Sequence, residues 1–287
     1  MIYFIYNQFK LKKICKVYLE ITNANFFKIN VSATFLSRHK CRYKTLIKSL
    51  KMKRYTLIII ALISINVQAQ SLSEFFSKSD IFFSTNVKNG KVAYDKIHKN
   101  QADLDAILTI AKSINVAEND TKNYQAFWIN AYNLSVIKGI IDNYPTNSPL
   151  DNAGFFDKTT HSLGGKQITL NDIEHKLLRA KFKDPRFHFV LVCGAIGCPP
   201  LINKAYLPNT LDAQLEKQTK IALNGNFLKV NDKKKRVQAS EIMKWYKEDF
   251  TMNNSTEIDF INKYRTEKVS EKSKISYFPY NWNLNKQ

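Results

Sequence analysis

The chain has 287 residues and a basic composition, with 44 Lys and Arg against 24 Asp and Glu. Residues 1–69 hold 13 of the basic residues and one of the acidic ones, so the rest of the chain has 31 basic and 23 acidic residues and a net charge of +8. That mild excess is compatible with an anionic envelope surface or an acidic substrate. It does not indicate a nucleic-acid-binding protein, and we expect no nucleic-acid partner.

A secretory signal peptide is predicted at residues 52–69. The basic start Met52–Arg54 is followed by the apolar run Tyr55–Val67, and the small residue Ala69 stands just before a cleavage site. The alternative is a membrane anchor, but a spanning helix needs about 20 apolar residues and this run is shorter. We therefore expect a mature chain that begins near Gln70 and is exported, to the periplasm or outside the cell.

Residues 1–51 precede this signal and are rich in Lys, Asn, Phe and Ile, without turn or cap signals. We interpret them as upstream sequence translated from a wrongly chosen start, or as disordered. The alternative is a basic targeting or nucleic-acid-binding arm. Residues 70–287 predict a single globular domain, because that length is enough to bury about 70% of the unfolded surface.

The first half of the domain is expected to be mostly helical. Ser71–Glu74 has the spacing of a capping box, and Ile81–Tyr94 predicts a hairpin around an Asn-Gly turn. Apolar residues at helical spacing predict one helix near Leu104–Ala111. They predict a longer helix over residues 120–144, ended by a proline.

The second half combines short strands with helices. We expect a strand at Lys166–Thr169, a helix at Asp172–Ala180, and a central buried strand at 187–193, which is too apolar for a surface strand. Further along, the patterns predict a helix over 209–225, a hairpin of 227–230 and 236–239, and helices starting at Ser240 and covering 257–264. The strands are few and linked by hairpins. The fold class is therefore α+β, a helix-rich single domain with a small, mostly antiparallel sheet.

The segment Asp184–Pro200 contains the densest group of chemically active residues, including the two cysteines of the mature chain, Cys193 and Cys198. Cys193 follows the predicted strand and begins a turn that contains glycines. It can be a nucleophile that a neighbouring base activates, an inert buried thiol, or the partner of Cys198 in a disulfide, which an exported compartment permits.

Three histidines are candidate bases for such a thiol. His188 precedes Cys193 by an odd number of residues, so in a strand their side chains face opposite ways unless a bulge intervenes. His175 and Arg179 lie four residues apart on one face of the predicted helix, which disfavours the imidazolium and leaves a neutral base. His161, in the preceding loop, is the third candidate.

A second polar group lies on the predicted long helix, within Phe127–Asn133. Asn130 and Asn133 share a helix face, where their amides can orient an imidazole or a substrate, or tie the helix to a neighbouring loop. Two cysteines with scattered histidines do not provide the usual ligand set of a zinc site, so we predict no metal and no cofactor.

Together these motifs resemble the domain of unknown function 547 family. The matching segments follow one another between about Val87 and the C-terminus, and they are Phe127–Asn133, Leu170–Arg179, Asp184–Phe189, Cys193–Ala195, Cys198–Pro200, Lys244–Phe250 and Tyr280–Asn285. The resemblance implies an exported bacterial protein without an established activity. It implies that function rests on Glu174, His175, Arg179, Asp184, Arg186, His188 and Cys193. The chain departs from the family pattern at Val192 and at Ile196–Gly197.

Two functions are compatible with these residues. The first is a thiol-dependent hydrolase or acyl-transferase, with Cys193 as nucleophile, His175 or His188 as base, and Asn130 orienting the imidazole. Arg186 would bind a substrate carboxylate, and the other candidate substrate-binding residues are Arg179, Asn133 and Glu174.

The second function is a non-catalytic envelope module for binding or interaction. Cys193 and Cys198 would then be bonded, and a buried polar network would hold the predicted strand to the long helix through Arg179, Asp184, Arg186 and His188. In either case the partner would be a small molecule, a peptide or an envelope component. No membrane span would remain after signal cleavage.

Overall fold

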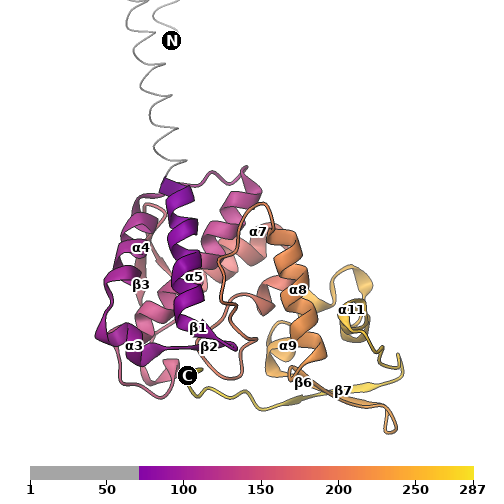
Figure 1. The fold of residues 1–287 in the computed structure, drawn as a ribbon. Coiled ribbons are helices and arrows are strands. Elements are labelled where there is room, and N and C mark those ends of the chain that lie inside the picture. The colour runs from indigo at the N-terminus through magenta and orange to yellow at the C-terminus, as the bar shows by residue number, and fades with distance from the viewer. Residues whose placement is uncertain (1–70) are drawn as a thin grey trace, which may run out of the picture. The chain divides into compact units, whose positions relative to one another are not determined.

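The longest helix, α5 (Thr121–Asp142), is the centre of the N-terminal half of the structure, a computed structural model that describes residues 71–287. Its side chains are buried on all sides from Ala126 to Ile137, so neighbouring elements surround it. α3 (Tyr94–Lys99) and α4 (Ala102–Ser113) pack against it (Figure 1). A helix over 71–86 contributes Phe75, whose ring lies 5.1 Å from that of Phe127.

The strands form three small sheets. β1 (Val87–Lys88) pairs with β2 (Lys91–Val92), and β3 (Thr160–Leu163) pairs with β4 (Lys166–Thr169), each as an antiparallel hairpin. The third sheet has the order β5 (Leu228–Asn231), β6 (Arg236–Ser240), β7 (Lys274–Phe278), with β5 antiparallel and β7 parallel to β6.

The remaining helices are mostly short. α8 (Leu211–Asn224) and α11 (Glu257–Tyr264) are the longer ones and pack against each other. The others are η1 (Pro149–Asp151), α6 (Leu170–Asp172), η2 (Ile173–Arg179), α7 (Ala180–Phe182), η3 (Pro185–Phe189), α9 (Glu241–Trp245), α10 (Lys247–Phe250) and η4 (Met252–Asn254).

Two hydrophobic cores meet at η3. The first core surrounds α5 and includes Phe187 and Val190, whereas the second surrounds the β5–β6–β7 sheet and includes Phe189. Both phenylalanines are fully buried. Because η3 places neighbouring side chains in both cores, it fixes one half of the protein against the other.

The C-terminal segment ties these halves together by backbone hydrogen bonds. Gly197 N–H donates to Asn281 O at 2.8 Å, Asn285 N–H donates to Gly194 O at 2.9 Å, and Val92 N–H donates to Asn285 O at 2.9 Å. The chain end therefore runs beside the loop that contains both cysteines and finishes next to β1 and β2 (Figure 1).

The α+β class and the helix-rich architecture are confirmed, and all described residues belong to one compact unit. Most of the expected helices are present, among them α11, which covers the predicted 257–264. The hairpin predicted at 227–230 and 236–239 is formed by β5 and β6. The expected start at Met52 and the signal peptide at 52–69 lie outside the described residues. Within residues 71–287, no helix has both the length and the apolar character needed to cross a bilayer.

The prediction of a strand at 187–193 is wrong, although most of this segment is buried as expected. Asp184 accepts a hydrogen bond from Arg186 N–H, and Pro185 stands at the first helical position, so a 3-10 helix begins there. Beyond it residues 191–193 have no regular secondary structure. The side-chain amide of Asn133 takes the place of a strand partner, accepting from Val192 N–H and donating to Val190 O, both at 2.9 Å.

The predicted hairpin over Ile81–Tyr94 is correct only at its turn. Asn89 and Gly90 have positive φ values of 51° and 78°, as an Asn-Gly hairpin turn requires. Residues 81–86 instead continue the first helix, because Phe82 and Phe83 are buried on its inner face while Ile81 is exposed. Strand β7 was not expected. It pairs in parallel with β6, whereas the other three strand pairs are antiparallel.

Candidate functional site

A pocket of about 300 Å³ lies over the Cys193–Cys198 disulfide, and we call it the disulfide pocket. Its wall combines aromatic rings with a few polar side chains. The lining residues are Tyr132, Phe156, Asn171, Glu174, His175, His188, Leu191, Cys193, Cys198, Ile242, Trp245, Tyr246, Tyr280 and Trp282.

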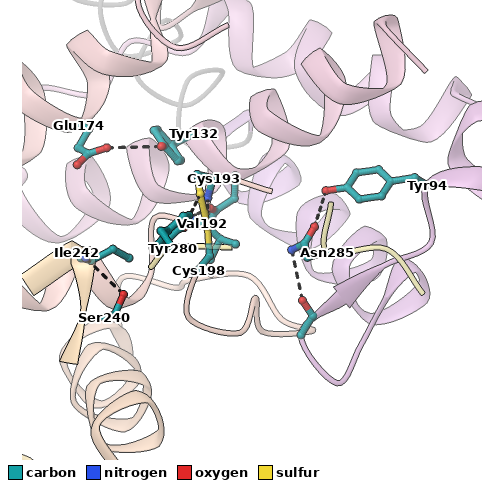
Figure 2. Close-up of a disulfide and its surroundings, with 12 residues drawn as sticks. Tyr94, Tyr132, Glu174, Val192, Cys193, Cys198, Ser240, Ile242, Tyr280 and Asn285 are labelled. Carbon is teal, nitrogen blue, oxygen red and sulfur yellow. Dashed lines mark hydrogen bonds between the residues drawn. A yellow bond between two sulfur atoms is a disulfide. The ribbon is translucent and has the colours of Figure 1, made fainter. Parts of the chain in front are cut away.

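The two cysteines form a disulfide that closes a short loop. Cys193 N–H donates to Cys198 Sγ at 3.0 Å, and the Tyr280 hydroxyl lies 2.9 Å from each sulfur (Figure 2). Burial raises the pKa of Tyr280 well above its usual range, so its hydroxyl keeps the proton with which it donates. The loop, the disulfide and Tyr280 therefore form one bonded unit at the wall of the pocket.

Gly194 sets the shape of this loop. Its φ of +83° is unfavourable for any residue with a Cβ, and a Cβ at this position would lie 2.5 Å from Ile140 Cδ1 of helix α5. The loop backbone therefore packs directly onto the long helix.

Helix η2 supplies the polar side of the pocket. It is a stretch of π-helix, a form often found at functional sites, and it directs Glu174 and His175 to the pocket. Arg179 lies behind them, where Nη1 contacts His175 Nδ1. Burial lowers the pKa of His175, and the charge of Arg179 lowers it further against the opposing effect of Glu174. His175 is therefore a neutral imidazole at pH 7, as expected from its spacing to Arg179.

His188 is held by Asp249 and Tyr246. Its Nε2 lies 2.6 Å from Asp249 Oδ2, and its ring stacks on that of Tyr246 at 4.1 Å. Arg179 Nε donates to the same carboxylate oxygen at 2.7 Å. Burial alone would raise the pKa of Asp249, but the hydrogen bonds from His188 and Arg179 outweigh it and hold that pKa well below its usual range.

Three aromatic side chains form another part of the wall. The rings of Trp245 and Trp282 stack at 6.0 Å, and Tyr280 tilts against both, at 5.1 Å from Trp245 and 4.6 Å from Trp282. Trp245 remains 46% exposed, so this aromatic wall is open to ligands.

Glu174 accepts a hydrogen bond from the Tyr246 hydroxyl. Its Oε2 lies 3.5 Å from the Tyr132 hydroxyl (Figure 2), and its Oε1 lies 4.0 Å from His188 Nδ1. The side chain is only 14% exposed. A carboxylate has more acceptor sites than these contacts use, so Glu174 can also accept hydrogen bonds from a ligand.

The structure brings together six of the predicted site residues, namely Glu174, His175, His188, Cys193 and Cys198 at the pocket and Arg179 directly behind it. Cys193 is bonded to Cys198, so in this state it carries no free thiol. Among the described residues, the hydrogen-bond partners of the two sulfurs are Tyr280 and a backbone amide, and neither is an imidazole. In this state the geometry does not provide an activated thiolate.

The prediction that Asn130 orients an imidazole is wrong. Its amide donates to Ala126 O and Tyr206 O and accepts from Tyr206 N–H, and the residue is fully buried. Asn133 is equally engaged, with Val190 and Val192, so it does not bind a substrate either. Both asparagines tie α5 to neighbouring loops, which was the alternative interpretation of their shared face.

Arg186 does not line the disulfide pocket, and its side chain already has carboxylate partners within the protein. It forms hydrogen bonds with both carboxylate oxygens of Asp184 and an ion pair at 2.9 Å with Asp212 of α8. His161 lies on β3 and does not line the disulfide pocket. The expected polar network therefore exists as two separate parts. One joins Arg179 and His188 to Asp249 and approaches the long helix only through Glu174, which lies between His188 and Tyr132. The other joins Arg186 to Asp184 and α8.

Several pocket residues were not selected from the sequence as site residues. These are the aromatic residues Trp245, Tyr246, Tyr280 and Trp282, together with Asp249, which lies behind the pocket. Their signal was available, because all of them fall in the two C-terminal segments that resemble the family. Their role depends on contacts with η2 and η3 that lie far away in the chain.

The fold and the site define a helix-rich α+β domain with an aromatic pocket at a disulfide. Residues 116–221 match the model of a family described as protein of unknown function, DUF547, which confirms the resemblance to that family. The chain therefore carries a domain of unknown function. No curated protein and no solved structure matches it. The matched segment contains Glu174, His175, His188 and both cysteines, whereas the aromatic wall lies beyond it.

Proposed function

We propose that the mature chain is an exported binding module that holds a ligand in the disulfide pocket. The observation that carries this proposal is the pocket itself, about 300 Å³ in volume, with an open aromatic wall on one side and few polar groups on the other. Sites for small molecules have this size and this mixture, in which rings supply contact area and polar groups fix orientation.

The disulfide has a structural role in this proposal. It closes the loop that contacts Tyr280, and Tyr280 in turn supports Trp245 and Trp282. A bonded Cys193 cannot form a thiolate, which is the form of cysteine that attacks a carbonyl group. The pocket can therefore bind without reacting.

Export rests on the sequence. The signal-peptide pattern at 52–69 directs a chain to an oxidising compartment, and a disulfide between the two cysteines of the mature chain is stable there.

A thiol-dependent hydrolase or acyl-transferase is the second candidate, and one observation favours it. Cys193 lines the same pocket as His175 and His188, so reduction would release a thiol near two imidazoles. This function requires Cys193 to be reduced in the working protein, whereas the binding module requires the disulfide.

A thermal-shift screen with a variant that fills the pocket tests the binding module. Asn171 lines the pocket and is exposed, so Asn171→Trp should obstruct the space without disturbing the core. Gln238→Trp adds the same side chain on exposed strand β6 and serves as the control. Compounds that stabilise the wild type and Gln238→Trp but not Asn171→Trp support the proposal. Compounds that stabilise all three proteins equally bind elsewhere. If every hit of the screen is of this kind, the proposed binding function is wrong.

A chloroacetamide probe separates the two functions. In the binding module, Cys193 reacts only after the disulfide has been reduced, and hydrolysis of activated esters is the same for wild type and Cys193→Ala. A protein that reacts without reductant, and whose esterase activity disappears in Cys193→Ala but not in Cys198→Ala, is the thiol enzyme.

A further inference from the structure

We propose that the disulfide pocket binds an organic ammonium ion, with the charged nitrogen placed between Glu174 and the aromatic wall. This inference rests on the proposed binding function and names the chemical class of the ligand. Three features of the pocket support it, and they are its charge, the polar partners of Glu174, and the aromatic rings that line the same pocket.

The charge of the pocket differs from that of the chain. The chain has 44 Lys and Arg residues, yet none of them is among the described residues that line this pocket, and Glu174 is the only carboxylate there. Arg179, the nearest guanidinium, lies behind the wall and is bound to Asp249 at 2.7 Å. An anionic ligand would meet no lysine or arginine in this pocket and would face a carboxylate, so the charge favours a cation.

The hydroxyl partners of Glu174 are neutral, and among the described residues no lysine or arginine forms an ion pair with it. The imidazole of His188 lies 4.0 Å from Glu174, and its other nitrogen is already bound to Asp249. The hydroxyl of Tyr132 lies at 3.5 Å, beyond the usual length of a hydrogen bond to a carboxylate. A buried carboxylate is stabilised when a cation supplies short, charge-assisted hydrogen bonds, and a ligand ammonium group can donate them here.

The rings across the pocket suit the same ligand. The face of an aromatic ring carries negative potential, and cations bind most strongly to tryptophan and then to tyrosine. Trp245, Trp282 and Tyr280 supply these rings, and the partial exposure of Trp245 leaves surface for an incoming group. A primary ammonium fits better than a quaternary one, because only the primary form has N–H groups for Glu174.

Titration with paired probes tests the proposal. The cationic probe is n-butylammonium, its neutral counterpart is 1-butanol, and choline serves as the quaternary ammonium. Binding is followed by calorimetry and by the fluorescence of the tryptophans. We expect saturable binding of n-butylammonium to the wild type at millimolar concentrations, as is usual for so small a probe. 1-Butanol should bind at least about tenfold more weakly, which corresponds to about 1.4 kcal/mol.

Glu174→Gln keeps the size of the side chain and removes its charge. It should weaken the binding of n-butylammonium at least about tenfold and leave the binding of 1-butanol unchanged. Glu248→Gln removes one negative charge from an exposed position outside the pocket and should bind like the wild type.

Equal binding of n-butylammonium and 1-butanol to the wild type, or no binding of either ammonium ion, overturns the ammonium assignment whether or not Glu174→Gln folds. Stronger binding of choline than of n-butylammonium overturns the primary-amine preference. The binding function is judged separately, since compounds excluded by Asn171→Trp can be neutral or anionic. A pocket that accepts only such compounds would disprove this inference and leave the proposed function standing.

Discussion

The imidazole of His188 is bound to the carboxylate of Asp249, with Nε2 and Oδ2 2.6 Å apart, although the two residues are 61 positions apart in the chain. Arg179 donates to the same oxygen. This three-residue contact connects η2, η3 and α10 behind the disulfide pocket. It fixes the ring of His188, which also stacks on Tyr246.

Replacing Asp249 should lower stability in a pH-dependent way. Its folded-state pKa is depressed, so the stabilisation is fully present above the unfolded pKa of about 4 and is lost as the pH falls toward the folded value. In urea denaturation, we expect Asp249→Asn to lower the free energy of unfolding by about 1 to 3 kcal/mol at pH 7. Below about pH 4 the loss should be smaller. The exposed carboxylate variant Asp232→Asn is the control. A constant difference from pH 7 to pH 3 would contradict this explanation.

Asn133→Leu should destabilise the fold strongly. The substitution keeps a buried side chain of similar size but leaves Val190 O and Val192 N–H without the amide that pairs with them. Each unpaired buried group costs about 1 to 3 kcal/mol, so we expect a total loss of about 2 to 5 kcal/mol by chemical denaturation. Asn143→Leu changes an exposed asparagine at the end of the same helix and should cost less than about 1 kcal/mol. Equal effects of the two variants would show that Asn133 does not replace a strand partner.

Substitutions at two glycines distinguish the cost of backbone strain from the cost of a steric clash. Gly165 has a φ of +70° with no atom within 4 Å of the position that a Cβ would take, whereas Gly194 combines a φ of +83° with a contact of 2.5 Å to Ile140. Gly165→Ala should therefore cost about 1 kcal/mol, and Gly194→Ala should cost about 1 to 3 kcal/mol more. Thermal unfolding of the two variants measures the difference. If the costs are the same, the loop does not pack on α5 as described.

Loss of the disulfide should cost about 2 kcal/mol, the value that loop-closure entropy gives for a bridge across so short a loop. The double variant Cys193→Ser, Cys198→Ser and the reduced wild type should unfold at similar urea concentrations, both lower than the oxidised wild type. The intrinsic fluorescence of the tryptophans should also change, since Tyr280 contacts both sulfurs and two of the tryptophan rings. Unchanged unfolding and fluorescence after reduction would contradict a structural role for the bond.

Local patterns in the sequence were sufficient for much of the fold. Apolar spacing located α4, α5 and α11, and the Asn-Gly pair located the turn between β1 and β2, because helices and tight turns depend on residues close in the chain. β7 was missed because its partner β6 is separated from it by α9, α10, η4 and α11. Parallel pairing over that distance leaves no local signal.

The segment 187–193 shows a second limit. A short apolar run indicates burial, but it does not distinguish a buried strand from another buried conformation. The deciding contact is the Asn133 amide, 57 positions from Val190.

In the site, the polar residues of η2 and η3 could be selected from their types and the family resemblance. Asp249 and the aromatic wall could not be assigned to the pocket, since only the folded chain brings them there.

The state of Cys193 decides between the binding module and the thiol enzyme, and the intact mass of the exported protein measures it most directly. The protein is treated with an alkylating reagent without reduction and then weighed. We predict a chain that begins near Gln70, takes up no reagent, and weighs two hydrogens less than its sequence with Cys193 and Cys198 reduced. Alkylation of both cysteines without prior reduction would contradict the binding-module proposal, because Cys193 would then be a free thiol at the wall of the pocket.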